Sequence, residues 1–256
     1  MLRSIAKLGP ALLAVVLMVW PIAQSAVAGE RDRQQVEGIV HDYILSHPEI
    51  IRDAISELQK REQAEAEKAV PAAIEGHRAV LLSSPHQAVI GNPKGDISVV
   101  EFFDYNCPYC RQSGPDLDAV LRQDRNVRIV LKEWPILGQG SVEAAQVSIA
   151  ARMQDGGARF QEFHDKLLAG HIRANKAVAI QAAASVGYDT RKLEIDMVSD
   201  EVKATIAEVA QLATALNFTG TPTFVAGKEA IAGAIGIDGL KGMIARARQD
   251  CKTPSC

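Results

Sequence analysis

The sequence predicts an α/β fold in which a small sheet is joined to a large helical block and is preceded by a helical arm. Three observations lead to this prediction. Apolar, β-branched runs at 97–103 and 127–131 are typical of buried strands. Residues 141–216, which precede a further strand near 224, are alanine-rich and helical in pattern. Residues 29–82, ahead of the first long strand, have the apolar spacing of amphipathic helices.

The first 28 residues have the pattern of an export signal. Arg3 and Lys7 precede an apolar run at 11–20, and Ala26-Val27-Ala28 offers the small residues at which such signals are cleaved. The apolar run is short for a membrane span, although a retained anchor is the alternative. Cleavage after Ala28 would place the chain in the periplasm, where cysteines can form and exchange disulfides.

The composition is that of a globular protein with a sizeable core. The chain has 256 residues, 47% of them hydrophobic, and a formal net charge of −3. No basic excess indicates a nucleic-acid partner, and we expect none.

The arm is predicted to form two helices separated at His47-Pro48, with Pro48 well placed to open the second. An apolar face of this kind must be buried on something. Two interpretations stay open, a cap on the main domain and an oligomerisation segment. His41 and His47 do not share a helical face, which disfavours a metal site there. The apolar positions at helical spacing are Val36, Ile39, Val40, Tyr43, Ile44, Ile50, Ile51, Ala54, Ile55 and Leu58.

The remaining elements follow in order. A short helix is expected at 71–82, and turn-forming residues at 83–85 and 91–96 place the start of the main domain near 83. A helix over 108–125 contains Gly114-Pro115, where we expect a kink. Breaks in the helical block are predicted at 156–157, 170–174 and 187–189. A hairpin then pairs 224–225 with 230–233 across Gly227-Lys228, and a closing helix covers 237–248.

The first long strand leads directly into Cys107-Pro108-Tyr109-Cys110. Pro108 suits the first position of a helix, where its missing N–H costs nothing. Cys107 then lies at the helix N-terminus, where unpaired N–H groups and the helix dipole stabilise a thiolate. Cys110, about one turn further on, could attack a mixed disulfide formed at Cys107. The pattern predicts thiol–disulfide exchange, with an inert disulfide as the alternative.

A second motif, Thr221-Pro222, opens a strand among β-branched residues, which is typical of a cis peptide bond. An ordinary X-Pro turn is the alternative. Together with the strand-dithiol-helix motif it resembles the thioredoxin superfamily. The Phe102-Phe103-Asp104-Tyr105-Asn106 context resembles the DsbA-like branch, in particular the suppressor-of-copper-sensitivity C group. This resemblance covers most of the chain beyond the signal.

The resemblance implies a thioredoxin fold with a helical insertion and an extracytoplasmic thiol–disulfide oxidoreductase that needs no cofactor or metal. Its partners would be unfolded or misoxidised exported proteins and a membrane redox partner that resets the dithiol. The arm would form a homo-oligomer. This assembly and Thr221 favour isomerase or reductase action over pure oxidation. Tyr109, which offers no positive charge, implies a potential less oxidising than that of DsbA. A copper-binding role for the same dithiol is the alternative.

Glu101 interrupts the apolar run of the first long strand. A buried carboxylate is costly unless it is paired or protonated. The resemblance implies that Glu101 exchanges a proton with Cys110. A purely structural pair with Lys132 is the alternative.

Two more cysteines, Cys251 and Cys256, lie in a polar C-terminal tail. In an oxidising compartment we expect a local disulfide between them. A disulfide relay to Cys107 and Cys110, or a zinc site formed with them, is less favoured, because no path from the tail to the dithiol is evident.

Overall fold

The computed structural model describes residues 33–250, and contacts divide the chain into two units, Met1–Glu65 and Ala66–Cys256. The predicted export signal at 1–28 and the predicted tail disulfide between Cys251 and Cys256 lie outside the described residues. Both stay predictions, as do the predicted domain bounds.

The described part of the first unit is helical. Residues 33–46 form one helix, and α2 (Glu49–Gly76) begins after the predicted interruption at His47-Pro48 and continues into the second unit. A helix-favouring ion pair, Arg61 with Glu57 at 2.9 Å, lies on α2. The large apolar side chains of this unit that remain exposed are Val36, Ile39, Val40, Tyr43, Leu45, Ile51, Ile55 and Leu58.

The helix predicted over 71–82 is wrong in its bounds. Pro71 lies inside α2, and α3 (Arg78–Ser83) is a separate short helix. Helix-favouring residues flank Pro71 on both sides, and they outweigh the backbone hydrogen bond that proline cannot donate. Ile74 and Leu81 are buried in a cluster with Val100 and Phe102. The C-terminal end of α2 therefore belongs to the core of the second unit, and so does α3.

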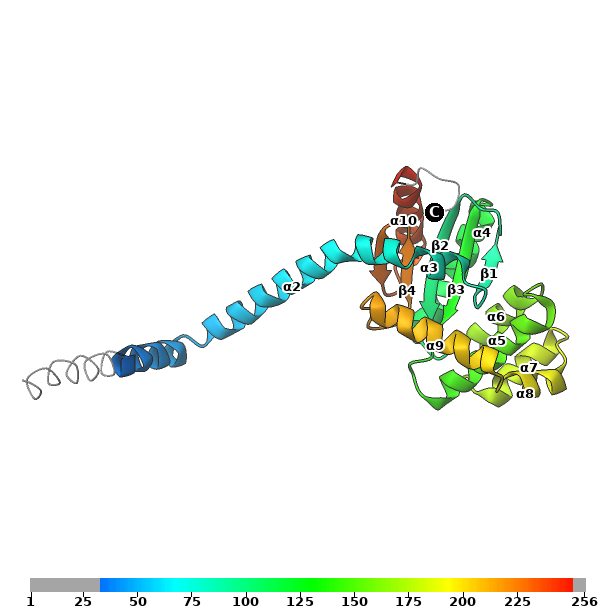
Figure 1. The fold of residues 1–256 in the computed structure, drawn as a ribbon, viewed down its shortest axis with the longest axis horizontal. Helices are drawn as coiled ribbons and strands as arrows, with labels where there is room; N and C mark the ends of the chain where they lie inside the picture. Colours follow the sequence, from blue (N-terminus) through cyan, green and yellow to red (C-terminus); the bar gives the residue numbers. More distant parts are fainter. Residues whose placement is uncertain (1–32, 251–256) are drawn as a thin grey trace, which may run out of the picture. The chain divides into compact units, whose positions relative to one another are not determined.

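A mixed five-stranded sheet of order β1-β3-β2-β4-β5 forms the centre of the second unit (Figure 1). Its central strand β2 (Ile97–Phe103) pairs in parallel with β3 (Val127–Glu133) and antiparallel with β4 (Thr223–Ala226). The predicted hairpin joins β4 to β5 (Glu229–Ala232). The edge strand β1 (Ala88–Gly91), which pairs antiparallel with β3, was not predicted, because four residues are too few to show a period.

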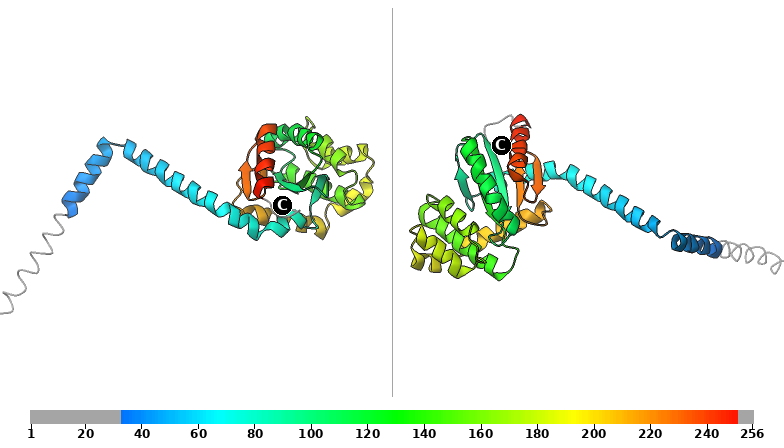
Figure 2. Two further views of the ribbon diagram at one scale, coloured as in Figure 1. Left: turned by 90° about the horizontal axis from the view of Figure 1, so that it is seen from above. Right: turned by 180° about the vertical axis from the view of Figure 1, so that it is seen from behind.

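Two apolar layers cover the sheet. On one face lie α4 (Pro108–Gln123) and α10 (Gly236–Asp250), which run side by side in Figure 2. The other face packs against α3, the end of α2 and α9 (Asp200–Ala215). Because side chains alternate along a strand, Val99, Glu101 and Phe103 of β2 face α4, whereas Val100 and Phe102 face the opposite layer.

The predicted helical block is present between β3 and β4. It consists of α5 (Gln139–Asp155), α6 (Phe160–Leu168), α7 (Lys176–Ser185), α8 (Thr190–Asp196) and α9. The three predicted breaks are confirmed, and a fourth follows α8. Helices α5 to α8 pack on one another beside the sheet (Figure 1). The architecture is a mixed α/β sheet with a helical insertion between β3 and β4, preceded by helices, as the sequence predicted.

Helices long and apolar enough to cross a bilayer are absent from residues 33–250.

Candidate active site

The end of β2 delivers Cys107 to the start of α4. Cys107 is the N-cap of this helix, with an extended backbone at φ −76° and ψ 120°, and Pro108 follows at the first helical position. The Cys107 amide donates to the Asp104 carbonyl at 2.9 Å and so closes the turn. Cys107 is 4% exposed, and Tyr109 beside it is 61% exposed. The nucleophile predicted from the sequence therefore sits at the positive end of a helix dipole.

Cys110 lies deeper than Cys107. It is fully buried, and both cysteines are free thiols. Burial raises the pKa of the Cys110 thiol, and the nearby Glu101 carboxylate raises that pKa further. An unassisted Cys110 thiol would therefore deprotonate poorly.

Glu101 reaches the same layer from the middle of β2. It is fully buried, and neither carboxylate oxygen has a hydrogen-bond partner among the described residues. Burial raises the pKa of Glu101 to about 8, so the carboxyl group is mostly protonated at neutral pH. The structure thus brings a neutral carboxylic acid into the electrostatic environment of Cys110.

The alternative pairing of Glu101 with Lys132 is wrong. In the parallel register Glu101 lies opposite Leu131, and Lys132 lies opposite Phe102. The Lys132 side chain consequently points to the other face of the sheet. There its ammonium donates to the Val80 carbonyl at 2.7 Å and lies 3.5 Å from Glu208.

The loop before β4 closes the site from the opposite side. The Thr221–Pro222 peptide bond is cis, as predicted, and the Cys107 thiol donates to the Thr221 carbonyl oxygen at 3.1 Å. These two segments, 114 residues apart in sequence, are thus in direct contact. Thr223 follows at the start of β4 and donates from its hydroxyl to the Gly220 carbonyl at 2.7 Å.

Asp104 and Asn106 lie in the turn before Cys107, and their contacts with distant loops were not predicted from the sequence. Asp104 accepts from the backbone amides of Ile136 and Leu137, and Asn106 bonds to Ala174. Asp and Asn commonly bond to backbone groups in turns, which was the available signal, but the partners depend on tertiary structure.

A buried polar chain behind the turn was also missed. The Tyr105 hydroxyl lies 2.9 Å from the Ser148 hydroxyl and 3.2 Å from His164 Nδ1, and Ser148 donates to Glu133 at 3.0 Å. All four side chains are at most 2% exposed. Burial lowers the pKa of His164 to about 4, so the imidazole is neutral. This network of hydrogen bonds connects the turn before Cys107 to α5 and α6.

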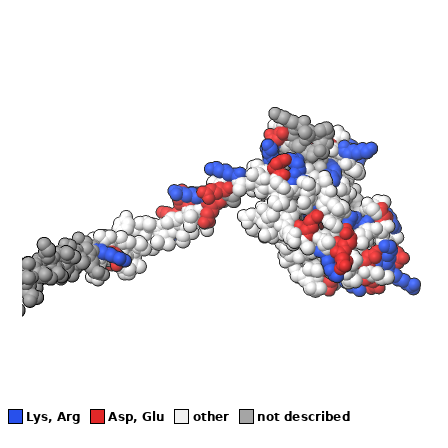
Figure 3. All heavy atoms as spheres, in the orientation of Figure 1, with Lys and Arg blue, Asp and Glu red and all other residues white. Residues whose placement is uncertain are grey.

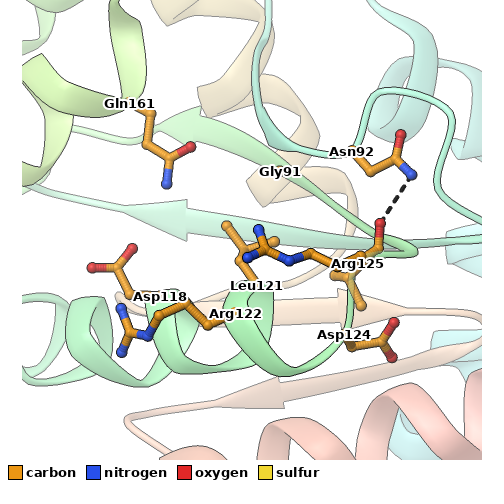
Figure 4. A pocket seen from close by; sticks show the side chains of 9 residues that line it. Gly91, Asn92, Asp118, Leu121, Arg122, Asp124, Arg125 and Gln161 are labelled. Atoms are coloured by element: carbon orange, nitrogen blue, oxygen red, sulfur yellow. Dashed lines mark hydrogen bonds between the residues drawn. The ribbon is translucent and has the colours of Figure 1, made fainter.

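An open pocket of about 310 Å³ lies at the other end of α4 (Figure 4). Asp118 and Arg122 project into it from the second half of the helix, and Gln161 faces them from α6. Asn92 donates to the Arg125 carbonyl at 2.9 Å on its rim. Its lining contains neither cysteine. Within residues 33–250 no group of three or more His, Cys, Asp or Glu side chains could hold a metal ion.

Two family models match the chain. The DSBA-like thioredoxin domain matches residues 98–245, which include both cysteines and Pro222. The copper resistance protein ScsC N-terminal domain matches residues 32–65, in the helical arm.

Three known proteins illustrate these similarities. A thioredoxin-like oxidoreductase from Silicibacter pomeroyi is 42% identical, with a TM-score of 0.65 over 68% of this chain and 99% of that one. BcfH of Salmonella enterica Typhimurium is 26% identical, with a TM-score of 0.70 over 89% of this chain and all of the other. The thiol:disulfide interchange protein DsbA of Bordetella pertussis is 30% identical over 52% of this chain and 64% of its own length.

The chain spans only about a quarter (24%) of the length of an Na(+)/H(+) antiporter NhaA from Salinispora arenicola, to which it is 28% identical over 159 residues. The match of the thioredoxin domain covers more than half of the chain. This chain therefore belongs to the DSBA-like thioredoxin family, with an N-terminal segment of the ScsC type.

Proposed function

We propose that this chain is a periplasmic thiol–disulfide oxidoreductase that exchanges disulfides with exported polypeptides. The observation that supports it most directly is the contact of 3.1 Å between the Cys107 thiol, at the N-terminus of α4, and the Thr221 carbonyl. A sulfur at a helix N-terminus is suited to act as a thiolate nucleophile.

The exchange has two steps. The Cys107 thiolate attacks one sulfur of a client disulfide, the client S–S bond breaks, and the departing client thiolate takes up a proton. Cys110 then loses its proton and attacks Cys107 in the mixed disulfide, which releases the second client thiol. Two electrons pass from the dithiol to the client. The reverse sequence oxidises the client, and a membrane redox partner resets the dithiol.

In its ionised form, Glu101 is proposed to accept the Cys110 proton in the second step. Its pKa of about 8 makes this carboxylate a stronger base than an ordinary Glu side chain, as the buried Cys110 thiol, whose own pKa is raised, requires. A carboxylate without hydrogen-bond partners is free to gain and lose a proton without breaking a network.

Thr221 and Pro222 are proposed to present the client. Their loop contacts Cys107 directly, so a client strand that pairs with the backbone of Thr221 would bring its sulfur to the nucleophile. Pro108 and Tyr109 complete the site, one by starting α4 and the other by remaining exposed beside the dithiol.

The direct test is the rate of exchange between the reduced chain and a peptide disulfide. Replacement of Cys107 by Ala should abolish the reaction. Ser83→Ala, at the end of α3 and away from the dithiol, serves as the control and should retain the parent rate. Equal rates in Cys107→Ala and the parent would contradict the proposal.

The arm favours isomerase or reductase action, because several dithiols in one assembly could hold a client while its disulfides are exchanged. We propose that the exposed apolar face of the first unit, with Ile39 at 62% and Ile55 at 52% exposure, is buried between copies of this chain. Ile39→Glu and Ile55→Glu should convert an oligomer to a monomer in sedimentation and slow the refolding of a client with scrambled disulfides. Refolding at the parent rate by the monomer would contradict the isomerase mode.

A copper-binding role is the second candidate, supported by the match to the copper resistance protein ScsC N-terminal domain. Two thiols one turn apart are soft ligands suited to Cu(I). Titration of the reduced chain with Cu(I), in the parent and in Pro222→Ala, separates the two functions. Copper binding should survive this substitution, whereas disulfide exchange should change.

A further inference from the structure

A second open pocket, of about 610 Å³, is formed by the end of α3, the loop between β1 and β2 and the first residues of β2 and β3. Two cationic side chains, Lys94 and Arg128, line it together with three serines, and none of the described residues that line it is Asp or Glu. The pocket in Figure 4, by contrast, has two arginines beside Asp118 and Asp124. The second pocket, called here the basic pocket, therefore has a positive charge that its own lining does not balance.

The basic pocket lies at the opposite end of the sheet from the dithiol. Ser98 and Arg128 are paired in the parallel register near the start of β2 and β3. Strand β2 ends at Phe103, just before the turn that leads to Cys107. The five residues from Ser98 to Phe103 span about 16 Å of extended strand. A ligand in the basic pocket would therefore leave the dithiol free.

Arg128 is partly buried, and it has no carboxylate partner among the described residues. Its Nη1 donates to the Ser98 hydroxyl oxygen at 3.2 Å, and its Nη2 donates to the Leu82 carbonyl at 2.8 Å. Arg152 and Arg159, which are also partly buried, each pair with a carboxylate. Burial lowers the pKa of Arg128, because its charge is desolvated without a counter-ion. An anion in the pocket would supply the missing partner.

Two serine hydroxyls of the lining also have hydrogen-bonding capacity to spare. The Ser98 oxygen accepts from Arg128, and the Ser84 oxygen accepts from the His86 amide at 3.1 Å. Neither hydroxyl donates to a described residue, although a hydroxyl can donate and accept at once. The unpaired Oε1 of Gln87 is enclosed, so it offers the pocket no acceptor. The lining therefore suits a ligand that has several acceptor oxygens.

The loop that carries Lys94 is held against the start of β3. The Asn92 side chain accepts from the Lys94 amide at 2.9 Å, and the Asn92 amide donates to the Val127 carbonyl at 3.0 Å. An added Cβ at Gly95 would collide with the backbone just before β3, so only glycine fits there. Lys94 itself is exposed, and its ammonium has no partner among the described residues. The loop thus brings a second cation to the pocket that Arg128 lines.

We infer that the basic pocket is a binding site for a phosphate group, held by Arg128, Lys94 and the hydroxyl of Ser98. The planar fork of an arginine matches the spacing of phosphate oxygens. The four oxygens of a phosphate can accept from donors on several elements, whereas a carboxylate has two oxygens in one plane. The pocket is larger than an inorganic phosphate ion requires, so the group belongs to a phosphate ester, either a soluble one or a lipid headgroup. This inference does not depend on the proposed function.

The test is isothermal titration calorimetry of the full chain with glycerol 3-phosphate, inorganic phosphate and acetate. Arg128→Gln and Lys94→Gln should each weaken the binding of glycerol 3-phosphate at least about tenfold, because each removes a charge-assisted hydrogen bond. Acetate should bind at least about tenfold more weakly than inorganic phosphate. Arg128 also bonds to α3, so its loss can unfold the chain, but Lys94 is exposed and Lys94→Gln tests the site in the folded protein.

Arg125→Gln is the matched control. It changes the net charge of the chain by the same amount, but in the pocket of Figure 4. The affinity for glycerol 3-phosphate should stay within about twofold of that of the parent. An equal loss in Arg125→Gln and Lys94→Gln would show that binding depends on net charge alone, and this would overturn the inference. Equal affinity for acetate and phosphate would also overturn it.

Sedimentation with vesicles of phosphatidylcholine, with and without phosphatidic acid, distinguishes the two sources of the phosphate group. Binding of glycerol 3-phosphate without binding to vesicles assigns a soluble ester. Binding to the vesicles that contain phosphatidic acid, weakened in Lys94→Gln but not in Arg125→Gln, assigns a lipid headgroup. A parent chain that binds neither the soluble phosphates nor these vesicles overturns the inference.

Cys107→Ala separates this inference from the proposed function. This variant should bind glycerol 3-phosphate as tightly as the parent, whether or not the parent exchanges disulfides. A loss of phosphate binding in Cys107→Ala would place the ligand at the dithiol and overturn the assignment to the basic pocket.

Discussion

Glu101 and Lys132 are two buried ionisable residues on neighbouring strands, and their surroundings differ. Glu101 of β2 is fully buried and Lys132 of β3 is 1% exposed. Lys132 has the Val80 carbonyl at 2.7 Å and Glu208 at 3.5 Å, whereas no described residue forms a hydrogen bond with the Glu101 carboxyl group. The same sheet therefore holds a paired charge on one face and an unpaired carboxylic acid on the other.

The layers that cover the two faces explain this difference. Helices α3 and α9 supply Lys132 with a carbonyl and a carboxylate, so the ammonium can remain charged. Helix α4 offers Glu101 an apolar surface and the Cys110 thiol, so the carboxyl group avoids its desolvation cost by staying protonated. Structural pairing thus accounts for the burial of Lys132, whereas no such pairing accounts for the burial of Glu101. The comparison supports a chemical role for Glu101.

The largest effect is expected for Lys132→Met. The substitution leaves Glu208 without its partner and the Val80 carbonyl without a donor, which should lower the free energy of unfolding by about 3 kcal/mol. Urea denaturation measures this change. The double variant Lys132→Met with Glu208→Gln should recover part of the loss, because it removes the uncompensated charge. A loss below about 0.5 kcal/mol in the single variant would show that the pair is not structural.

Glu101→Gln should raise the free energy of unfolding, whereas Lys132→Met should lower it. The parent must keep this carboxyl group protonated at a pH where the unfolded chain ionises it, and glutamine removes that cost. We expect the free energy of unfolding at pH 7 to rise by about 2 kcal/mol. The second exchange step should slow at the same time, because Cys110 loses its proton acceptor. A destabilised variant, or one with an unchanged second step, would contradict the assignment.

The pH dependence sharpens this contrast. Below pH 4.5 the Glu101 carboxyl group is protonated in both states and contributes no pH dependence. From pH 4.5 to about 8 the unfolded chain has lost this proton while the folded chain keeps it, so stability falls as the pH rises. Denaturation at pH 4 and pH 7.5 should therefore show little difference between the parent and Glu101→Gln at the lower pH and the full difference at the higher one.

The smallest effect is expected at an exposed ion pair. Basic and acidic residues are interspersed over the helices beside the sheet (Figure 3), and Lys192 lies 2.7 Å from Asp196 there. Solvent screens such pairs, so Lys192→Met should change the free energy of unfolding by less than about 0.5 kcal/mol. A loss of stability as large as that of Lys132→Met would show that burial does not explain the difference between the two ion pairs.

The sequence predicted the features that depend on local patterns. The strand that ends at Phe103, Pro108 at the start of α4 and the helical block all have short-range signals. The face on which Lys132 lies could not be predicted, because it depends on the strand register. For the same reason, only tertiary contacts show that Asn106 bonds to Ala174. Strand β1 was missed because its short apolar run is stabilised by pairing rather than by its own pattern.

The most direct test of the account is the site at which a client is captured. In Cys110→Ser the second step is blocked, so an oxidised peptide should accumulate as a mixed disulfide, and mass spectrometry should locate the new bond at Cys107. In Cys107→Ser no comparable adduct should form at Cys110, because this thiol is fully buried and its pKa is raised. Adducts at Cys110 in Cys107→Ser, formed as fast as those at Cys107 in the other variant, would contradict the account.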